Sequence, residues 1–338
     1  MSTSRPTMED VAALAGVSRA LVSIVFRGTA GASPTTRERV LAAAAELGYQ
    51  PDRRASRLGR TRTRMLGVVF GVGHAFHGDL VDSLYAAAEG SAYEVVLSGV
   101  TPRRGEEEAV RALLAERCEA VILIGSGLSS GALAELAGRL PTVSLARDVR
   151  VPGLDVVRTD DAEGLRQAVT HLHALGHTAI VHTDGGRAPG AAQRRRGYHT
   201  AVRRLGLAEA PLLTGGIAEE DGARAAAELL ASSTPATAVT AFNDRCALGL
   251  IETVRRAGRR VPEDLSVVGF DDIRAASYAH IALTTIRQDA DALGRLAIQR
   301  ALARLEEGSP PAAPAVVPPT LIVRSTTSPV RLPDGSAG

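Results

Sequence analysis

From residue 65 onward, short apolar runs alternate with helical patterns, and this alternation occurs twice along the chain. The stretch LGVVF at 66–70 is typical of a buried strand. Strands that alternate with helices form a parallel sheet with helices on both faces. The first run predicts strands at 66–70, 93–97, 120–124 and 142–145, with helices at 79–90, 106–116 and 131–140.

The second run begins after residue 160. It predicts helices at 162–175, 194–205, 220–231 and 247–256, and strands at 179–182, 238–241 and 265–269. A long helix at 289–307 and a closing strand near 321–323 complete the pattern. The fold class is therefore α/β, with two doubly wound lobes.

The first fifty residues carry a different, purely helical pattern. Thr7 and Asp10 have the spacing of a capping box, Gly16 suits a tight turn, and Ser18 suits the cap of a second helix. A third helix is expected between Ser33 and the glycine at position 48. Two helices joined by a glycine-containing turn form the helix-turn-helix pattern, whose second helix enters the major groove of DNA.

The charge distribution agrees with a DNA-reading head. The chain has 338 residues and a net charge of +2, and it contains no lysine. Residues 1–64 hold eleven arginines against five acidic residues, a charge of +6, which leaves −4 for the rest. Segment 51–64 is strongly basic, which predicts a linker that orders on contact with DNA.

The sequence also argues against several other classes. The polar start predicts no signal peptide, and no apolar run has the length of a membrane span, so a cytoplasmic protein is expected. Cys118 and Cys246 lie far apart, which favours two reduced thiols and no metal site. Asp271 and Asp272 are a poor glycosidase pair, because adjacent loop residues point in different directions. No phosphate-binding Gly-Lys-Ser/Thr loop and no G-x-S-x-G motif is present.

Several ordered motifs then resemble one known family, the LacI-type bacterial transcription regulators. They are DVAxxAGVS at 10–18, YxPD at 49–52, LGH at 175–177, ND at 243–244, VPEDLSVVGFDD at 261–272 and LTTIRQ at 283–288. The resemblance runs from about residue 7 to residue 327. It implies a homodimeric transcription regulator, a repressor, that binds a pseudo-palindromic operator under the control of a small molecule.

The resemblance also implies the domain limits. The head is expected at 1–50 and the hinge at 51–64. The effector-binding and dimerisation domain follows at 65–327, and a disordered tail at 328–338. Lobe 1 is expected to comprise 65–159 and 289–319, and lobe 2 to comprise 160–288 and 320–327.

The expected DNA contacts lie on the head and the hinge. Arg19 can hold a guanine edge bidentately, Ala20 offers only an apolar contact, and Leu58 matches a residue that wedges into the minor groove. The sequence departs from the family at Leu21, Ile24 and Asp52, so base preference stays open. The full set is Thr7, Ser18, Arg19, Ala20, Ser23, Ile24, Arg27, Tyr49, Arg53, Ala55 and Leu58.

The expected effector site lies between the lobes, at the carboxyl ends of the strands. The candidates are His74, Phe76, Arg147, Arg194, Asn243, Asp271 and Gln288. A sugar is the expected ligand. Ala146, Ile217 and His74 depart from the residues that sugar-binding members often carry there. A nucleobase, or a phosphorylated or acidic effector drawn to Arg147 and Arg194, stays an alternative, acting as corepressor or activator. A secreted sugar-binding protein shares this body fold, but the head and the missing signal peptide argue against it. No enzyme activity, cofactor or metal is expected, and the location is the nucleoid of a bacterial cytoplasm.

Overall fold

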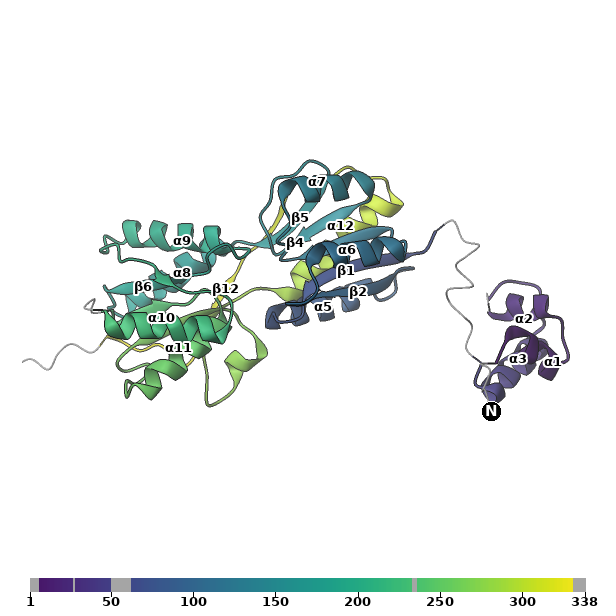
Figure 1. Ribbon diagram of the computed structural model, residues 1–338, viewed down its shortest axis with the longest axis horizontal. Helices are drawn as coiled ribbons and strands as arrows, with labels where there is room; N and C mark the ends of the chain where they lie inside the picture. The colour runs from purple at the N-terminus through teal and green to yellow at the C-terminus, as the bar shows by residue number, and fades with distance from the viewer. Residues whose placement is uncertain (1–5, 27, 50–61, 233–235, 331–338) are drawn as a thin grey trace, which may run out of the picture. The chain divides into compact units, whose positions relative to one another are not determined.

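The computed structural model describes residues 6–26, 28–49, 62–232 and 236–330 (Figure 1). Contacts within the chain divide it into two units, Met1–Thr63 and Arg64–Gly338. Within the described residues, no helix has both the length and the apolar character needed to span a bilayer.

The first unit is a bundle of three short helices, α1 (Met8–Ala15), α2 (Arg19–Phe26) and α3 (Pro34–Leu47). Thr7 and Asp10 form the predicted capping box on α1, and Gly16 ends that helix with a φ of 62°. Val11, Val22 and Val40, one from each helix, are fully buried and form the core of the unit. The local signals in the sequence therefore produce the predicted helix-turn-helix.

The second unit contains two six-stranded sheets. The first sheet has the order β11-β5-β4-β3-β1-β2 and defines lobe 1. Helices α5 and α12 pack together on one face of this sheet, while α6 and α7 pack with the opposite hydrophobic cluster. Its elements are β1 (Met65–Gly71), α5 (Ala75–Ala88), β2 (Glu94–Val100), α6 (Glu106–Ala115), β3 (Ala120–Ile124), α7 (Ser130–Arg139), β4 (Thr142–Leu145), β5 (Leu154–Thr159), α12 (Ala290–Glu306) and β11 (Ala315–Val317).

The second sheet has the order β12-β10-β9-β8-β6-β7 and defines lobe 2. Helices α8 and α9 pack together over one face, and α10 packs on α11 over the other (Figure 1). Its elements are α8 (Asp161–Ala174), β6 (Ile180–Asp184), α9 (Ala191–Arg204), β7 (Leu213–Thr214), α10 (Glu219–Ala231), β8 (Ala238–Thr240), α11 (Asp244–Arg256), β9 (Ser266–Asp271), a 3₁₀ turn (Arg274–Ser277), β10 (Thr284–Arg287) and β12 (Thr320–Ile322).

The chain crosses between the lobes three times, after β5, after β10 and after β11. All strands run parallel to their neighbours except β12, which is antiparallel to β10. The carboxyl ends of the parallel strands in each sheet therefore lie at the edges that the crossovers connect, which is where doubly wound folds bind ligands.

The structure differs from the predicted elements in several places. Helix α5 begins at Ala75 instead of 79, α9 at Ala191 instead of 194, and α11 at Asp244 instead of 247. Strands β5, β7, β10 and β11 have no counterpart in the prediction. Residues 328–330, which were assigned to a disordered tail, are tied to lobe 2, because Ser328 N–H donates to Ser266 Oγ and Val330 N–H to the Leu175 carbonyl.

Candidate functional site

The exposed start of α2 is the candidate DNA-reading surface. Ser18, Arg19 and Ala20 are exposed, whereas Ser23 and Ile24 are half-buried. Ser18 Oγ accepts a hydrogen bond from the Leu21 N–H at 3.2 Å and so caps α2. The Arg19 guanidinium forms an ion pair with Glu9 at 3.0 Å. Exposed ion pairs of this kind contribute only about 0–1 kcal/mol, so Arg19 can exchange Glu9 for DNA at little cost.

The other predicted head residues have structural roles or lie outside the described residues. Both the backbone N–H and the Oγ1 of Thr7 bond to Asp10, at 2.7 and 2.8 Å. The Tyr49 ring packs against Phe26, with 5.6 Å between ring centroids. The residues that lie outside the described ranges are Arg27, Arg53, Ala55 and Leu58.

Arg37 is a structural residue that the sequence analysis did not single out. From α3 it donates to the Val25 carbonyl at 2.9 Å and to the Thr29 carbonyl at 3.3 Å. These carbonyls belong to the end of α2 and the loop behind it, so Arg37 fixes where the second helix ends. An arginine four residues after the predicted N-cap Ser33 was the available signal.

The second candidate site is a cavity of about 70 Å³ between the two lobes. Six of the seven predicted effector residues line it: His74, Phe76, Arg194, Asn243, Asp271 and Gln288. The cavity is further lined by Ala146 and Ile217, the two other positions at which the sequence departs from sugar-binding members of the family. Residues outside the predicted set also line it, among them His77, Gly125, Phe242 and Arg245.

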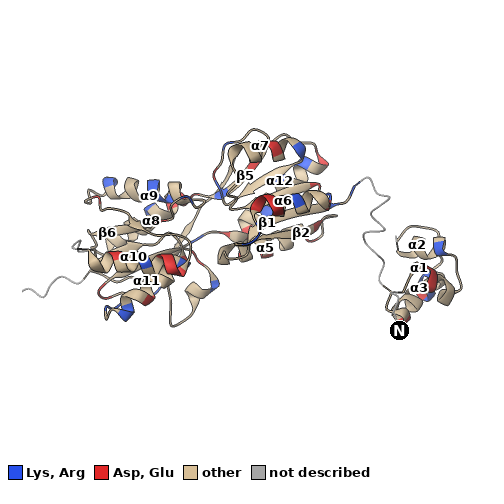
Figure 2. Cartoon of the chain, viewed as in Figure 1, with Lys and Arg blue, Asp and Glu red and all other residues tan. Residues whose placement is uncertain are grey.

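Arg194 lies at the centre of this site, in an arginine-rich helix (Figure 2). It is only 5% exposed. Its Nε donates to Asp161 Oδ1 at 2.8 Å and its Nη1 to the Phe242 carbonyl at 2.6 Å. The guanidinium also stacks on the Phe270 ring, 3.6 Å from the ring centroid. Because each of these contacts restricts the side chain, Arg194 is held rigidly before any ligand binds.

Glycine allows Arg194 and Asp161 to meet. A Cβ at Gly197 would come within 2.2 Å of the Ala162 carbonyl oxygen, so only glycine lets α9 approach the first turn of α8 this closely. Asp161 lies in that first turn, with its carboxyl among buried groups. Burial raises the pKa of Asp161, and the Arg194 charge acts against this rise.

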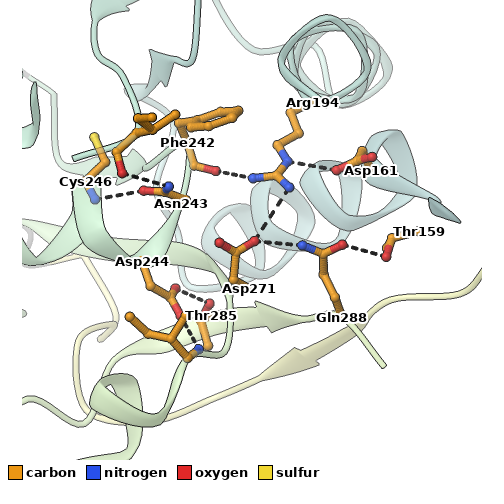
Figure 3. A network of polar contacts seen from close by, with 12 residues as sticks. Thr159, Asp161, Arg194, Phe242, Asn243, Asp244, Cys246, Asp271, Thr285 and Gln288 are labelled. Carbon is orange, nitrogen blue, oxygen red and sulfur yellow. Dashed lines mark hydrogen bonds and ion pairs between the residues drawn. The ribbon is translucent and has the colours of Figure 1, made fainter. Parts of the chain in front are cut away.

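Asp271 connects Arg194 to the crossover between the lobes (Figure 3). Its Oδ1 lies 3.6 Å from Arg194 Nη2 and accepts a hydrogen bond from Gln288 Nε2 at 2.7 Å. Gln288 Oε1 in turn accepts from Thr159 Oγ1, at the end of β5, at 2.6 Å. Burial raises the pKa of Asp271 to about 6, against the opposing effect of Arg194. One polar network therefore joins the strand ends of both lobes.

Asn243 and Asp244 hold the wall of the cavity. Asn243 Oδ1 caps α11 by accepting from the Cys246 N–H at 2.8 Å, and its Nδ2 donates to the Ile217 carbonyl at 3.1 Å. The fully buried Asp244 accepts from Thr285 Oγ1 at 2.5 Å and from the Ile273 N–H at 2.9 Å. Burial and the nearby Asp271 charge raise the pKa of Asp244 well above its usual range. Asp244 thus fixes the loop that presents Asp271, while Asn243 ties the start of α11 to the loop before α10.

Arg147 lies elsewhere and is not among the residues that line the cavity. Its Nη1 donates to the Ser126 and Leu128 carbonyls, each at 2.7 Å, within lobe 1. Arg147 does follow the end of a strand, β4, as predicted. Its guanidinium, however, bonds to the carbonyls of a neighbouring loop and does not reach the cavity. Within the described ranges, no group of three or more His, Cys, Asp or Glu side chains is arranged to hold a metal ion.

Comparison with known proteins identifies the class of protein that this fold and these sites define. The model for "Bacterial regulatory proteins, lacI family" matches residues 7–52, and that for "Periplasmic binding protein-like domain" matches 169–327. The HTH-type transcriptional regulator DegA of Bacillus subtilis is 32% identical over 336 residues, which cover 96% of this chain and 99% of DegA.

Solved structures agree with these matches. A LacI transcriptional regulator from a Rhodococcus species is 48% identical, with a TM-score of 0.77 over 79% of this chain and 99% of that one. A lac repressor dimer bound to operator and the anti-inducer ONPF is 30% identical, with a TM-score of 0.83 over 96% of this chain and 100% of that one. The chain belongs to the lacI family of bacterial regulatory proteins. It is a ligand-controlled, DNA-binding transcription regulator.

Proposed function

We propose that two copies of this chain repress transcription from a pseudo-palindromic operator, and that a neutral hydroxylated molecule, in the simplest case a sugar, controls this binding from between the lobes. The supporting observation is the network that runs from Thr159 in lobe 1 through Gln288 and Asp271 to Arg194 in lobe 2. A ligand that bonds to this network changes how the two lobes are held together. It acts through its different affinities for the two arrangements.

The charges around the cavity favour a neutral ligand over the acidic alternative. Arg194 lies between two carboxylates, and Arg245 forms an ion pair with Glu219. Arg147, the other arginine expected to attract an anion, donates to two carbonyls outside the cavity. An anionic ligand would have to displace these partners. A polyol instead finds donors and acceptors that can exchange hydrogen bonds without a change of charge.

Apolar surface on the second unit supports a homodimer. Val72, Tyr85 and Leu97 are large exposed hydrophobic side chains of lobe 1. In lobe 2, Tyr278 is exposed, and the partly buried Ile281 lines a nearby surface hollow of about 600 Å³ together with the charged side chains Glu252 and Arg255. Exposed apolar surface of this kind is typical of a protein interface, and the structurally similar lac repressor is described as a dimer. We assign a second copy of this chain to this surface.

The DNA contacts belong to the same proposal. Arg19 reads a base edge, Ala20 contacts a thymine methyl, and Ser18 and Ser23 bind phosphates. Leu58, beside Ala55, wedges into the minor groove at the centre of the operator. The head comprises residues 1–50 and the hinge 51–64, and the regulator works in the bacterial cytoplasm on the nucleoid.

Operator binding by the Arg19→Ala variant tests the reading surface. We expect a loss of at least about fivefold in the preference for the palindromic DNA upstream of the gene over scrambled DNA, because one bidentate guanine contact discriminates by about 1–3 kcal/mol. Fluorescence anisotropy at several salt concentrations measures it, and binding to both DNAs should weaken steeply with salt. Glu9→Ala is the matched control, since it breaks the same ion pair and keeps Arg19. Equal losses in both variants, or an unchanged preference in Arg19→Ala, would contradict the assignment.

A further inference from the structure

Two histidines of the loop and first turn after β1 stack on each other in the wall of the cavity. The rings of His74 and His77 are 4.5 Å apart between centroids and nearly parallel, at 13°. Both residues line the cavity from lobe 1. His77 is 9% exposed, and neither the DNA contacts nor the Arg194 network involves it.

One hydrogen bond determines which nitrogen of His77 carries the proton. The Gly71 N–H donates to His77 Nδ1 at 3.0 Å, so Nδ1 has to present a lone pair. A neutral imidazole has one N–H, and in His77 this N–H must therefore be on Nε2. The backbone of β1 thus fixes the tautomer.

Burial keeps the ring neutral. It lowers the pKa of His77 to about 3, with a smaller contribution from His74. At the pH of a cell, His77 is a neutral group that donates from Nε2. It cannot accept there, and it carries no charge that would attract an anion.

The Nε2 edge lies beside an opening that a glycine creates. Gly125, at the end of β3, has a φ of 55°, and a Cβ there would come within 2.9 Å of His77 Nε2. The missing side chain leaves this edge facing the cavity, with Pro189 of lobe 2 on its far side. Across the residues that the structure describes, His77 Nε2 has no hydrogen-bond partner. His77 as a whole is only 9% exposed, and its Nε2 is not among the fully buried side-chain atoms that lack a partner, so this donor has open surface at the cavity where it can meet an acceptor.

We propose that His77 is a specificity-determining residue, whose Nε2–H donates to an oxygen atom of the ligand from lobe 1. The inference rests on the proposed neutral, hydroxylated ligand and adds one requirement to it. The ligand carries a hydroxyl, ring or carbonyl oxygen opposite His77, and an ammonium group at that position is rejected. Asp271 of lobe 2 has the complementary property, because its ionised carboxylate only accepts hydrogen bonds.

Three substitutions separate this role from a purely structural one. Asn at position 77 places an amide oxygen close to where Nδ1 was, so His77→Asn keeps an acceptor for Gly71 and loses the donor to the cavity. Gln reaches further, so His77→Gln restores an amide donor near the Nε2 position. His77→Phe removes both functions. His199→Gln, on the outer part of α9 beside Glu209, is the matched control.

Binding to the full-length protein is measured by calorimetry with a panel of neutral sugars that includes D-galactose, D-ribose and cellobiose, together with their deoxy and amino derivatives. For a sugar that binds, we expect His77→Asn and His77→Phe to weaken binding about tenfold, the worth of one neutral hydrogen bond. His77→Gln should stay within about threefold of the unsubstituted protein, and His199→Gln should match it. One deoxy derivative should bind the unsubstituted protein more weakly than its parent sugar does. If the same derivative and its parent bind His77→Asn equally well, the hydroxyl missing from that derivative is the one that His77 contacts.

The tautomer is checked without any ligand. In ¹⁵N-histidine spectra, the His77 signals, assigned by their loss in His77→Phe, should show a protonated Nε2 and an unprotonated Nδ1 between pH 5 and 8. A proton on Nδ1 overturns the inference. So does tight sugar binding that His77→Asn leaves unchanged, although the proposed function then stands. If no neutral sugar binds and an acidic one does, the proposed ligand class is wrong and this inference is wrong with it.

Discussion

At the scale of single residues, Asp271 shows how a binding group lowers the stability of the folded protein. Its carboxyl is buried beside Arg194, with a pKa of about 6 against an ordinary value of 3.8. Because the folded-state pKa is the higher one, the stabilising contribution of the protonated carboxyl is fully present below about pH 4 and is lost as the pH rises through 6. At neutral pH the ionised carboxylate therefore lowers the free energy of unfolding by about 3 kcal/mol.

We expect Asp271→Asn to be more stable than the unsubstituted protein at pH 8 and no more stable at pH 4. The neutral amide keeps the shape of the carboxyl and removes the cost of burying its charge. Thermal unfolding at the two pH values measures the difference. Asp82→Asn, at an exposed position on α5, should change little at either pH. If Asp271→Asn is instead less stable than the unsubstituted protein at pH 8, the favourable contact of the carboxylate with Arg194 outweighs the cost of burying its charge.

The sequence identified some of these residues and missed others for a clear reason. Motifs and strand ends pointed to Arg194, Asp271 and Gln288, all of which line the cavity. Asp161 was missed because its role depends on an arginine 33 positions away. The role of His77, which adjoins the predicted Phe76, depends on one backbone N–H. No pattern of residue types in a single sequence carries those contacts.

At the scale of elements, α10 and α11 pack more closely than side chains allow. A Cβ at Gly249 would come within 1.8 Å of the Glu219 carbonyl oxygen, and one at Gly222 within 1.9 Å of the Cys246 carbonyl oxygen. Each helix therefore presents a glycine to the backbone of the other. This close packing sets the position of the start of α11, where the N-cap Asn243 and Arg245 of the first turn line the cavity.

Gly249→Ala should destabilise the second unit by at least about 1–3 kcal/mol, because the added methyl meets backbone that has to move. Chemical denaturation measures the loss. Gly138→Ala in α7 is the control: a Cβ there has no neighbour within 4 Å, and alanine is favoured over glycine inside a helix by about 0.5–1 kcal/mol. Destabilisation by Gly138→Ala and none by Gly249→Ala would contradict the packing argument.

The elements that the sequence predicted well are those with local signals. The capping box at Thr7 and Asp10 and the glycine ends at Gly16 and Gly48 are present in the structure. Two of the strands that were missed, β7 and β11, are only two and three residues long and exist because a neighbouring strand pairs with them. Helix α5 begins at Ala75, before the predicted start at 79. Gly78 is a residue type that is typical of a helix boundary, but here it lies inside the helix.

At the scale of the whole molecule, the regulator has two binding activities in two separately folded units. In the function proposed above, the head reads DNA through α2, and the cavity between the lobes binds the controlling ligand. Control requires that the two binding events share a free energy of coupling. The regulator can be free, bound to ligand, bound to operator, or bound to both. The coupling is reciprocal, because these four states form one thermodynamic cycle.

A ligand that weakens operator binding by some factor must therefore bind more weakly by the same factor when operator is present. We expect this factor to be about 5–150. Calorimetry of a binding sugar with and without saturating operator DNA measures one side, and anisotropy of labelled operator with and without that sugar measures the other. Asp271→Ala supplies the control, since it should abolish the ligand response and leave operator affinity intact. The prediction is wrong if the sugar changes operator affinity but the operator does not change sugar affinity. The response then cannot come from a site on this chain, because a single coupling energy cannot have two values.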